Sequence, residues 1–193
     1  MTKKEGKAII FSAPSGAGKT TIVRAVISKI PGMEFSISAT TRSPRANEVH
    51  GVDYYFLSEH EFQLSIVQEK FLEWEQVYDG VYYGTLKSEV QRIWSHGGIA
   101  IFDVDVEGGI SIKSQLKDNA LSVFIKVANE NVLRERLMRR KTENENDLAE
   151  RLNKSFTEMK KESSFDRSIL NDDLNAAIEE TKSIISDFLD TGK

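Results

Sequence analysis

The stretch SAPSGAGKT at residues 12–20 constrains the fold more than any other part of the sequence. It follows an apolar run with β-branched and aromatic residues, KAIIFS at 7–12. It leads into KTTIVRAVISKI at 19–30, whose apolar residues recur at helical spacing until Pro31 and Gly32. A strand, a glycine-rich loop and a helix in this order are the context in which G-x-x-x-x-G-K-[ST] binds phosphate. The sequence therefore predicts the opening of a βαβ unit.

One position of this loop departs from the strict pattern, because Ala13 stands where the first glycine is expected. That residue begins the turn and needs no phosphate contact, so alanine can occupy it if its φ is negative. The backbone N–H groups of residues 16–20 can face one concavity at the positive end of the helix. Lys19 can then reach the β- and γ-phosphates, and the hydroxyl of Thr20 suits Mg²⁺. The alternative is an ordinary strand–turn–helix corner rich in small residues.

The rest of the chain predicts a parallel α/β sheet flanked by helices. Apolar runs at 99–105 and 120–127 are typical of buried strands, and 165–170 predicts a short fourth strand. Helical patterns follow at 107–116, 130–140 and 174–189. Buried runs that alternate with helices favour a parallel sheet. Residues 35–87 interrupt this rhythm with most of the tyrosines and with short alternating segments, and they predict a small β-rich insertion in the core.

Composition narrows the classes of protein to which the chain can belong. Its 193 residues suffice for one sizeable core. The absence of cysteine excludes disulfides, thiolate metal sites and cysteine nucleophiles, and fits a cytoplasmic location. The formal net charge of -4 argues against general nucleic-acid binding. The apolar runs are too short for a membrane span or a signal peptide. We expect a soluble cytoplasmic monomer or homodimer with no nucleic-acid or membrane partner.

Acidic side chains follow the second buried strand, in DVDVEGG at 103–109. Open α/β sheets bind ligands at this edge, and Asp103 is similar to the acid that supports Mg²⁺ in phosphate-loop enzymes. Asp103 or Asp105 could instead cap the following helix. The residues from Asp105 to Gly108 also spell the D-x-x-G of GTPases. The N-K-x-D motif of those proteins is absent, since NKSF at 153 lacks the aspartate.

The insertion carries groups suited to a second phosphate and to a base. Arg42 and Arg45 lie three residues apart, beside hydroxyls and tyrosines. Arginine forks bind phosphate oxygens in pairs, so with Tyr54 they could hold a monophosphate; they could also form a solvated basic turn. Glu73 can accept from a base edge with two adjacent donors, which guanine has and adenine lacks. The alternation in FLEWEQV equally fits a solvent-facing strand residue at this position.

Five blocks of the sequence occur in the order and spacing of guanylate kinases: SAPSGAGKT, SISATTRSPRANEVHGVDYYF, FLEWEQVYDGVYYGT, IFDVDVEGG and ILNDDL. The chain resembles this family over nearly its whole length, and alanine is frequent there at the first loop position. The resemblance implies transfer of the γ-phosphoryl group of ATP to GMP with Mg²⁺ as cofactor, and leaves open whether dGMP is accepted. The alternative is a non-catalytic guanylate-kinase-like binding module for acidic or phosphorylated peptides.

The same resemblance implies a division of the chain into three parts. The expected P-loop core covers about 1–34, 88–133 and 152–193. A GMP-binding insertion is expected at about 35–87, and a mobile lid at about 134–151. The lid departs from the family at Lys141, where glycine is usual. This departure leaves open whether Arg139 or Arg140 contacts phosphate, and the lid arginines could instead lie on exposed helix faces.

The resemblance also implies roles for individual residues. The expected ATP-binding residues are Ala13, Pro14, Ser15, Gly16, Ala17, Gly18, Lys19, Thr20 and Thr21, with Asn171 near the adenine. The expected residues around the GMP phosphate are Ser38, Arg42, Arg45, Tyr54 and Tyr83. Guanine would meet Glu73 through N1–H and its 2-amino group, Thr85 through O6, and Asp105 beside it, with Asp103 between the two nucleotides. The expected catalytic residues are Lys19, Arg42, Arg136, Arg140 and Arg151. Thr20 would bind Mg²⁺, with Asp103 acting through a water molecule.

Overall fold

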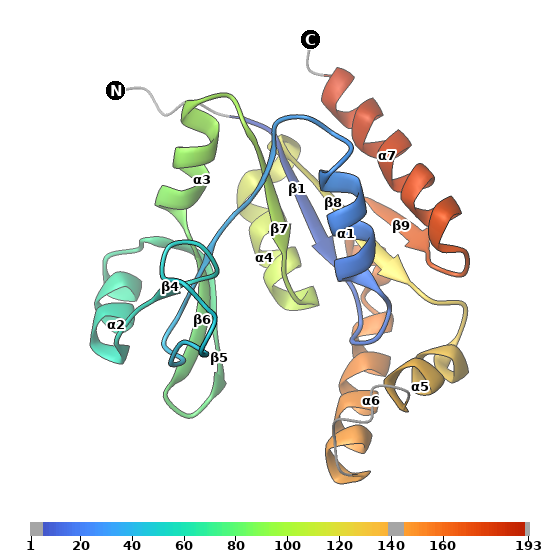
Figure 1. Ribbon diagram of the computed structural model, residues 1–193, viewed down its shortest axis with the longest axis horizontal. Coiled ribbons are helices and arrows are strands. Elements are labelled where there is room, and N and C mark those ends of the chain that lie inside the picture. Colours follow the sequence, from blue (N-terminus) through green and yellow to red (C-terminus); the bar gives the residue numbers. More distant parts are fainter. Residues whose placement is uncertain (1–5, 139–144, 192–193) are drawn as a thin grey trace.

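The computed structural model describes residues 6–138 and 145–191, apart from the side chains of Tyr78 and of residues 145–150. Two sheets organise this part of the chain (Figure 1). The larger sheet forms the centre of the molecule, and the smaller one lies to its side with the helix that covers it. Among the described residues, none of the helices combines the length and the apolar character that crossing a bilayer requires.

The central sheet has five strands in the order β2-β7-β1-β8-β9, and all its neighbouring strands are parallel. This arrangement confirms the predicted parallel α/β sheet, including the short strand near residue 165. The strands are β1 (Ala8–Ser12), β2 (Met33–Phe35), β7 (Ile99–Asp103), β8 (Ala120–Lys126) and β9 (Arg167–Leu170).

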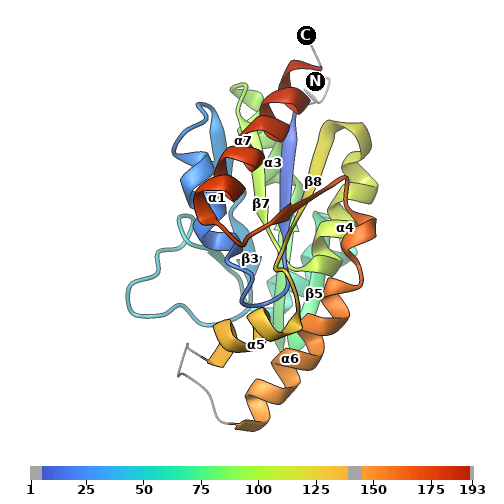
Figure 2. The same cartoon turned by 90° about the vertical axis from the view of Figure 1, so that its right-hand side faces the viewer.

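Helices cover both faces of this sheet, as its alternating side chains require. Ile9 and Phe11 of β1 point into a cluster that includes residues of α1 and α7, which lie side by side (Figure 2). Ala8 and Ile10 point the other way, toward α3 and α4. The helices of this part of the chain are α1 (Lys19–Ile27), α3 (Lys87–Ser95), α4 (Val106–Leu116), α5 (Glu130–Met138), α6 (Glu145–Met159) and α7 (Leu174–Asp190), with short 3₁₀ turns at Lys117–Asn119 and Glu162–Ser164.

The second sheet is built from the segment between β2 and α3, and its strand order is β4-β3-β6-β5. The strands are β3 (Ser38–Thr40), β4 (Tyr55–Phe56), β5 (Phe71–Tyr78) and β6 (Val81–Leu86). Helix α2 (Glu59–Val67) covers one face, where Phe62 stacks on Phe71 at 4.4 Å between ring centroids. We did not predict this helix. Its start is encoded by a capping box, in which Ser58 and Glu61 bond each other's backbone N–H groups.

The chain passes between the two sheets only twice within the described residues, at residues 36–37 and where β6 runs into α3. The buried carboxylate of Glu89 on α3 joins these crossings. It accepts from the backbone N–H of Ile37 at 3.3 Å and from the hydroxyl of Tyr55 at 2.9 Å. The guanidinium of Arg92 donates to it through Nε and Nη2. Burial alone would raise the pKa of the Glu89 carboxyl, but these hydrogen bonds lower it below its ordinary value.

We expect Tyr55→Phe to lower the free energy of unfolding by about 1.5–3 kcal/mol, because it removes a hydrogen bond to a buried charged group. Denaturant unfolding measures this loss. The lowered pKa of Glu89 means that the carboxylate stabilises the fold above its ordinary titration range, and that this contribution is lost as the pH falls.

Most of the effect of Tyr55→Phe should therefore vanish in a Glu89→Ala background, which removes the acceptor, as a double-mutant cycle would detect. An equal loss in both backgrounds would mean that the Tyr55 hydroxyl stabilises the protein through a group other than Glu89.

Candidate active site

The loop between β1 and α1 has the backbone of a phosphate-binding loop. Gly16 and Gly18 both have φ of +91°, in the left-handed region that glycine adopts without strain. Among the described residues only Glu69 and Lys117 are non-glycine residues with positive φ, so Ala13 keeps an ordinary backbone. The methyl group of Ala13 is buried in the core cluster. Alanine is therefore compatible with this loop at the position where the strict motif has glycine.

Two side chains from distant segments form hydrogen bonds with the backbone of this loop. The amide of Asn171 donates to the carbonyl of Ala17 at 2.7 Å. Arg136 donates to the same carbonyl at 3.3 Å and to the carbonyl of Asn171 at 2.8 Å. A Cβ on Gly18 would come within 2.4 Å of the Asn171 amide nitrogen, so glycine is required there by contact as well as by φ. In this structure both side chains thus contact the loop backbone.

Lys19 joins the phosphate loop to the end of the neighbouring strand. Its Nζ lies 2.7 Å from Oδ1 of Asp103 and also donates to the carbonyl of Val104. Thr20 and Thr21 begin α1 with exposed side chains. The ammonium group, the carboxylate and the hydroxyl of Thr20 line one cavity of about 490 Å³. Cations and oxygen donors suited to phosphates therefore face the carboxyl edge of the sheet.

Helix α6 forms another wall of this cavity, and most of the residues that it contributes were not predicted from the sequence. Arg151 was expected there; Lys154, Ser155 and Glu158 line the cavity beside it. These four polar residues recur at i, i+3, i+4 and i+7, which is the signal that places them on one helix face. Burial raises the pKa of Glu158, and the charge of Asp105 adds to this effect.

The face of the second sheet that lies opposite α2 carries a row of polar side chains. Ser38, Thr85 and Glu73 stand opposite one another on β3, β6 and β5. The hydroxyl of Thr85 donates to Oε1 of Glu73 at 2.6 Å. Burial raises the pKa of Glu73 to about 7 against the pull of this hydrogen bond, with the charges of Asp105 and Glu75 contributing. Glu73 is therefore a partly buried acceptor and not a fully solvent-facing strand residue.

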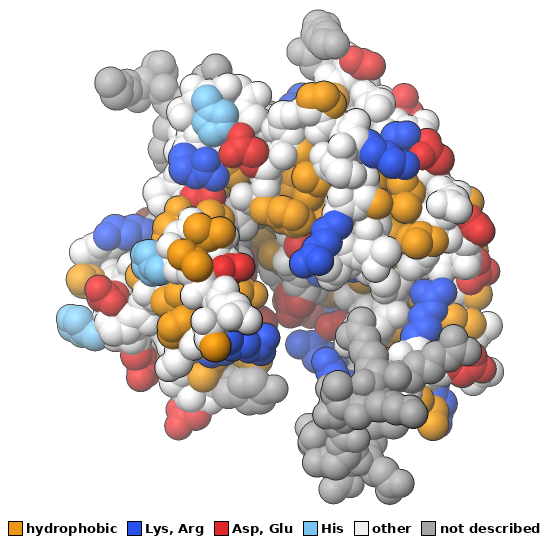
Figure 3. Space-filling model, viewed as in Figure 1, with side chains coloured by type: hydrophobic (Ala, Val, Ile, Leu, Met, Phe, Trp, Pro, Cys, Tyr) orange, Lys and Arg blue, Asp and Glu red, His pale blue; other side chains and the backbone are white. Residues whose placement is uncertain are grey.

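Asp105 lies where the two walls meet. Its Oδ1 accepts from the backbone N–H of Gly108 at 2.8 Å and caps α4, which was one of the two alternatives. Its Oδ2 lies 3.8 Å from Nζ of Lys154. Asp103, by contrast, ends β7 and pairs with Lys19. The molecule is hollowed between the two parts that carry these residues, and acidic and basic side chains are visible in the hollow (Figure 3).

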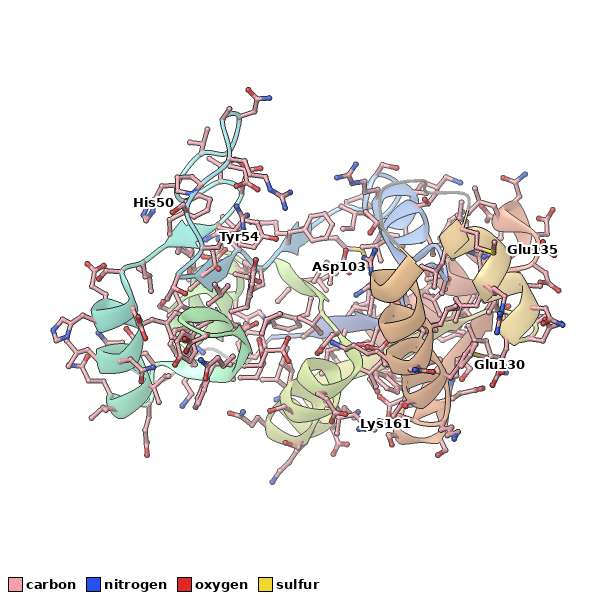
Figure 4. The ribbon with its side chains drawn as sticks, turned by 90° about the horizontal axis from the view of Figure 1, so that it is seen from below. His50, Tyr54, Asp103, Glu130, Glu135 and Lys161 are labelled. Atoms are coloured by element: carbon pink, nitrogen blue, oxygen red, sulfur yellow. The ribbon has the colours of Figure 1, made fainter. Side chains whose placement is uncertain are left out.

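A cluster of aromatic rings surrounds Arg42 at the other end of the second sheet. Nε of Arg42 donates to the hydroxyl of Tyr83 at 3.2 Å, and its guanidinium lies 5.4 Å from the ring centre of Tyr54. Tyr54 meets Tyr83 edge-on at 6.1 Å. Tyr54 and Asp103 are labelled on the two opposite sides of the site in Figure 4. Glu48 also binds Arg42, and sequence reasoning missed it.

Of the remaining expected residues, some are described by the structure and others are not. The side chain of Arg45 is exposed, and its backbone N–H donates to Glu48 at 2.8 Å. Arg140, together with Arg139 and Lys141, lies outside the described residues.

Helices α5 and α6 extend across the expected lid boundaries, and Phe35 pairs with Ile101 in the central sheet. The segment that forms the second sheet runs from 36 to 86.

Comparison with known proteins gives one family. The family model described as guanylate kinase matches residues 5–188. A guanylate kinase of Bacteroides thetaiotaomicron is 45% identical over 95% of this chain and 90% of its own length. A guanylate kinase of Salinibacter ruber is 42% identical over 94% of this chain and 96% of its own. The crystal structure of guanylate kinase from Anaplasma phagocytophilum, at 23% identity, has the same fold, with a TM-score of 0.69 over 97% of this chain and 88% of that one.

We expect the Glu73 carboxyl to titrate near pH 7 in the ligand-free protein, because its burial disfavours the charged form. Carbon-13 NMR of labelled glutamate side chains measures this directly. Thr85→Val should raise the pKa further by removing the hydrogen bond to the carboxylate.

The sign of the effect on stability follows from the raised pKa. The folded protein holds this proton more tightly than the unfolded chain, so the contribution of Glu73 to stability falls as pH rises from its ordinary value of 4.5 to about 7. A titration at the ordinary value would show that the carboxylate is solvated.

Proposed function

The chain belongs to the guanylate kinase family and is an ATP:GMP phosphotransferase, and we propose that it divides its two nucleotides between the two walls of the cleft. The observation that supports this division is that Asp105 lies between two sets of polar groups. It lines the cavity of the phosphate loop, and its charge helps to raise the pKa of Glu73, which pairs with Thr85 on the second sheet. ATP would occupy the wall formed by β1, α1 and α6. GMP would lie on the face of the second sheet opposite α2.

On the ATP side, the loop at residues 13–21 would hold the phosphates. Its backbone N–H groups and the positive end of α1 favour an anion, and the two left-handed glycines let it approach closely. Lys19 would turn from Asp103 to the β- and γ-phosphates. Arg136 would leave the backbone carbonyls that it now contacts and donate to phosphate oxygens instead. Arg151 and Arg140 would also donate to these oxygens. Asn171 lies against the loop at the side where the adenine end of ATP would extend.

The residues present at the loop fit a hard divalent cation. The exposed hydroxyl of Thr20 and the carboxylate of Asp103 line the same cavity, and both are oxygen donors. Among the described residues, no cluster of three or more acidic, histidine or cysteine side chains could form a complete metal cage. Mg²⁺ suits such a sparse site because it keeps several waters and binds substrate phosphates. When bound to ATP, Mg²⁺ would neutralise phosphate charge, with Thr20 as ligand and Asp103 acting through a water molecule.

On the GMP side, Glu73 would read the base. Its carboxylate can accept from N1–H and from the 2-amino group of guanine. The Thr85 hydroxyl would then turn its proton from Glu73 to O6, since it has a single proton to donate. Asp105 would lie beside the base. The GMP phosphate would be held by Ser38, Arg42, Arg45, Tyr54 and Tyr83.

The reaction then needs no covalent intermediate with the protein. A phosphate oxygen of GMP attacks the γ-phosphorus of ATP in line. The new O–P bond forms as the bond to the bridging oxygen of ADP breaks, which gives ADP and GDP. Catalysis consists of positioning the two phosphates and of stabilising their charge through Lys19 and the arginines. No observation favours the non-catalytic binding module, because the phosphate loop and its lysine are intact.

We expect Lys19→Ala to lower kcat by about 10²–10³ or more, the usual effect of removing one charge-stabilising donor from a reacting centre. A coupled assay of ADP and GDP formation measures the rate. Lys29→Ala is the matched control, since Lys29 is an exposed lysine paired with Glu179 away from the cleft. Turnover near that of the unaltered protein in Lys19→Ala would overturn the assignment of the phosphate loop.

We expect Glu73→Gln to weaken GMP binding selectively. The amide offers one acceptor oxygen and turns an NH₂ group toward the second guanine donor. An unpaired buried donor costs about 1–3 kcal/mol, or roughly 5- to 150-fold in Kd. Calorimetry with GMP and, separately, with a non-hydrolysable ATP analogue should show a loss for GMP alone. Glu179→Gln on α7 is the control, and unchanged GMP affinity in Glu73→Gln would remove Glu73 from the base site.

A further inference from the structure

Glu48 makes the most extensive contact of any side chain with Arg42. Its two carboxylate oxygens accept from Nη1 and Nη2 of Arg42, each at 2.9 Å. Given the proposed GMP site, on which this inference rests, we propose that Glu48 is the positioning residue that aims Arg42 at the GMP phosphate. It would hold one edge of the guanidinium so that the other edge receives the phosphate.

The donors of Arg42 show which edge stays open. A guanidinium has five N–H groups and two edges that can each bind a pair of oxygens. Glu48 fills the end-on edge between Nη1 and Nη2, and the second N–H of Nη1 donates to the carbonyl of Ser43 at 2.8 Å. One N–H of Nη2 and the Nε–H remain on the side-on edge. Among the residues that the structure describes, the Nε–H donates only to the hydroxyl of Tyr83, at 3.2 Å.

The side-on edge is suited to a phosphate together with Tyr83. The tyrosine hydroxyl can accept from Nε of Arg42 and donate its own proton to a phosphate oxygen. A second phosphate oxygen would then accept a hydrogen bond from the remaining N–H of Nη2. The rings of Tyr54 and Phe56 lie 5.4 Å and 5.8 Å from the guanidinium carbon, so they restrict its rotation. Arg42 thus faces the site with one edge bound and the other available.

Glu48 is itself held in place, as a positioning residue must be. Its Oε2 also accepts from the backbone N–H of Arg45 at 2.8 Å, and its own N–H donates to the carbonyl of Arg45 at 3.0 Å. The hydrogen bond from Arg42 lowers the pKa of the Glu48 carboxyl, as does the bond from the Arg45 backbone, so the group stays ionised at neutral pH. The carboxylate is anchored by the backbone of the turn that carries it.

A competing interpretation makes Glu48 a substitute for the phosphate, which GMP would have to displace. The two interpretations predict opposite signs. A positioning residue strengthens GMP binding, whereas a competitor weakens it. The open side-on edge favours positioning, because the phosphate can bind without breaking the contacts of Glu48.

The test compares GMP with guanosine, which has the same base and ribose but no phosphate. Glu48→Gln preserves the shape of the side chain but turns an NH₂ group toward one of the three N–H donors that Glu48 accepts. We expect the Kd of GMP to rise about tenfold, the scale at which groups that orient a binding residue act in metal sites. The Kd of guanosine, measured by NMR titration, should be unchanged. Glu59→Gln, an exposed residue of α2, is the matched control.

Steady-state rates give a second readout. Glu48→Gln should raise KM for GMP while kcat at saturating GMP and KM for ATP stay near those of the unaltered protein. Equal weakening of GMP and guanosine would show that Glu48 only supports the fold of the pocket. Tighter GMP binding would show that it competes with the phosphate, and unchanged binding would remove it from the site. In all three cases the unaltered protein still phosphorylates GMP; failure of that reaction would instead overturn the proposed function.

Discussion

The cleft depends on the parallel pairing of β1 with β7 and β8. Because the three strands run in one direction, the segments that follow them all emerge at one edge of the sheet. The register sets Phe11 opposite Asp103, so the phosphate loop begins beside the acidic end of β7. This arrangement brings Lys19 within reach of Asp103. Arg136 follows β8 and Asn171 follows β9, and both side chains donate to the carbonyl of Ala17 in the loop.

The electrostatics of the cleft are those of a site built before its ligands arrive. Glu73 and Glu75 on the second sheet and Glu158 on α6 all have raised pKa values, for which burial is the main cause. The cost of desolvating Glu73 is therefore met during folding. A base that offers two N–H donors recovers this cost when it binds, which is the advantage of preorganisation.

The sequence predicted those parts of the molecule that local pattern determines. The phosphate loop could be predicted because its glycines, lysine and flanking elements are contiguous. Helix α2 was not predicted, although Ser58 and Glu61 form a capping box at its start. The reason is that apolar and polar residues alternate in the surrounding segments, as they do in strands. Glu48 could not be assigned from sequence, because its proposed role depends on hydrogen bonds that its carboxylate forms with the guanidinium of Arg42 across a turn. The burial of Glu73 likewise depends on Thr85 of a neighbouring strand and on α4, which no local pattern reveals.

The chain enters and leaves the second sheet at adjacent points. Ile37, just before the first strand of this sheet, donates its N–H to Glu89, just after the last strand. None of its strands takes part in the central sheet. The segment from 36 to 86 is therefore a cassette with its own hydrophobic cluster under α2, and it meets the central part where Leu72 of β5 packs beside α4. Its replacement by another cassette with the same spacing of ends would leave every strand pair of the phosphate-loop sheet intact. If the nucleotides are divided as proposed, recognition of the phosphoryl acceptor could thus diversify independently of the residues that bind the donor.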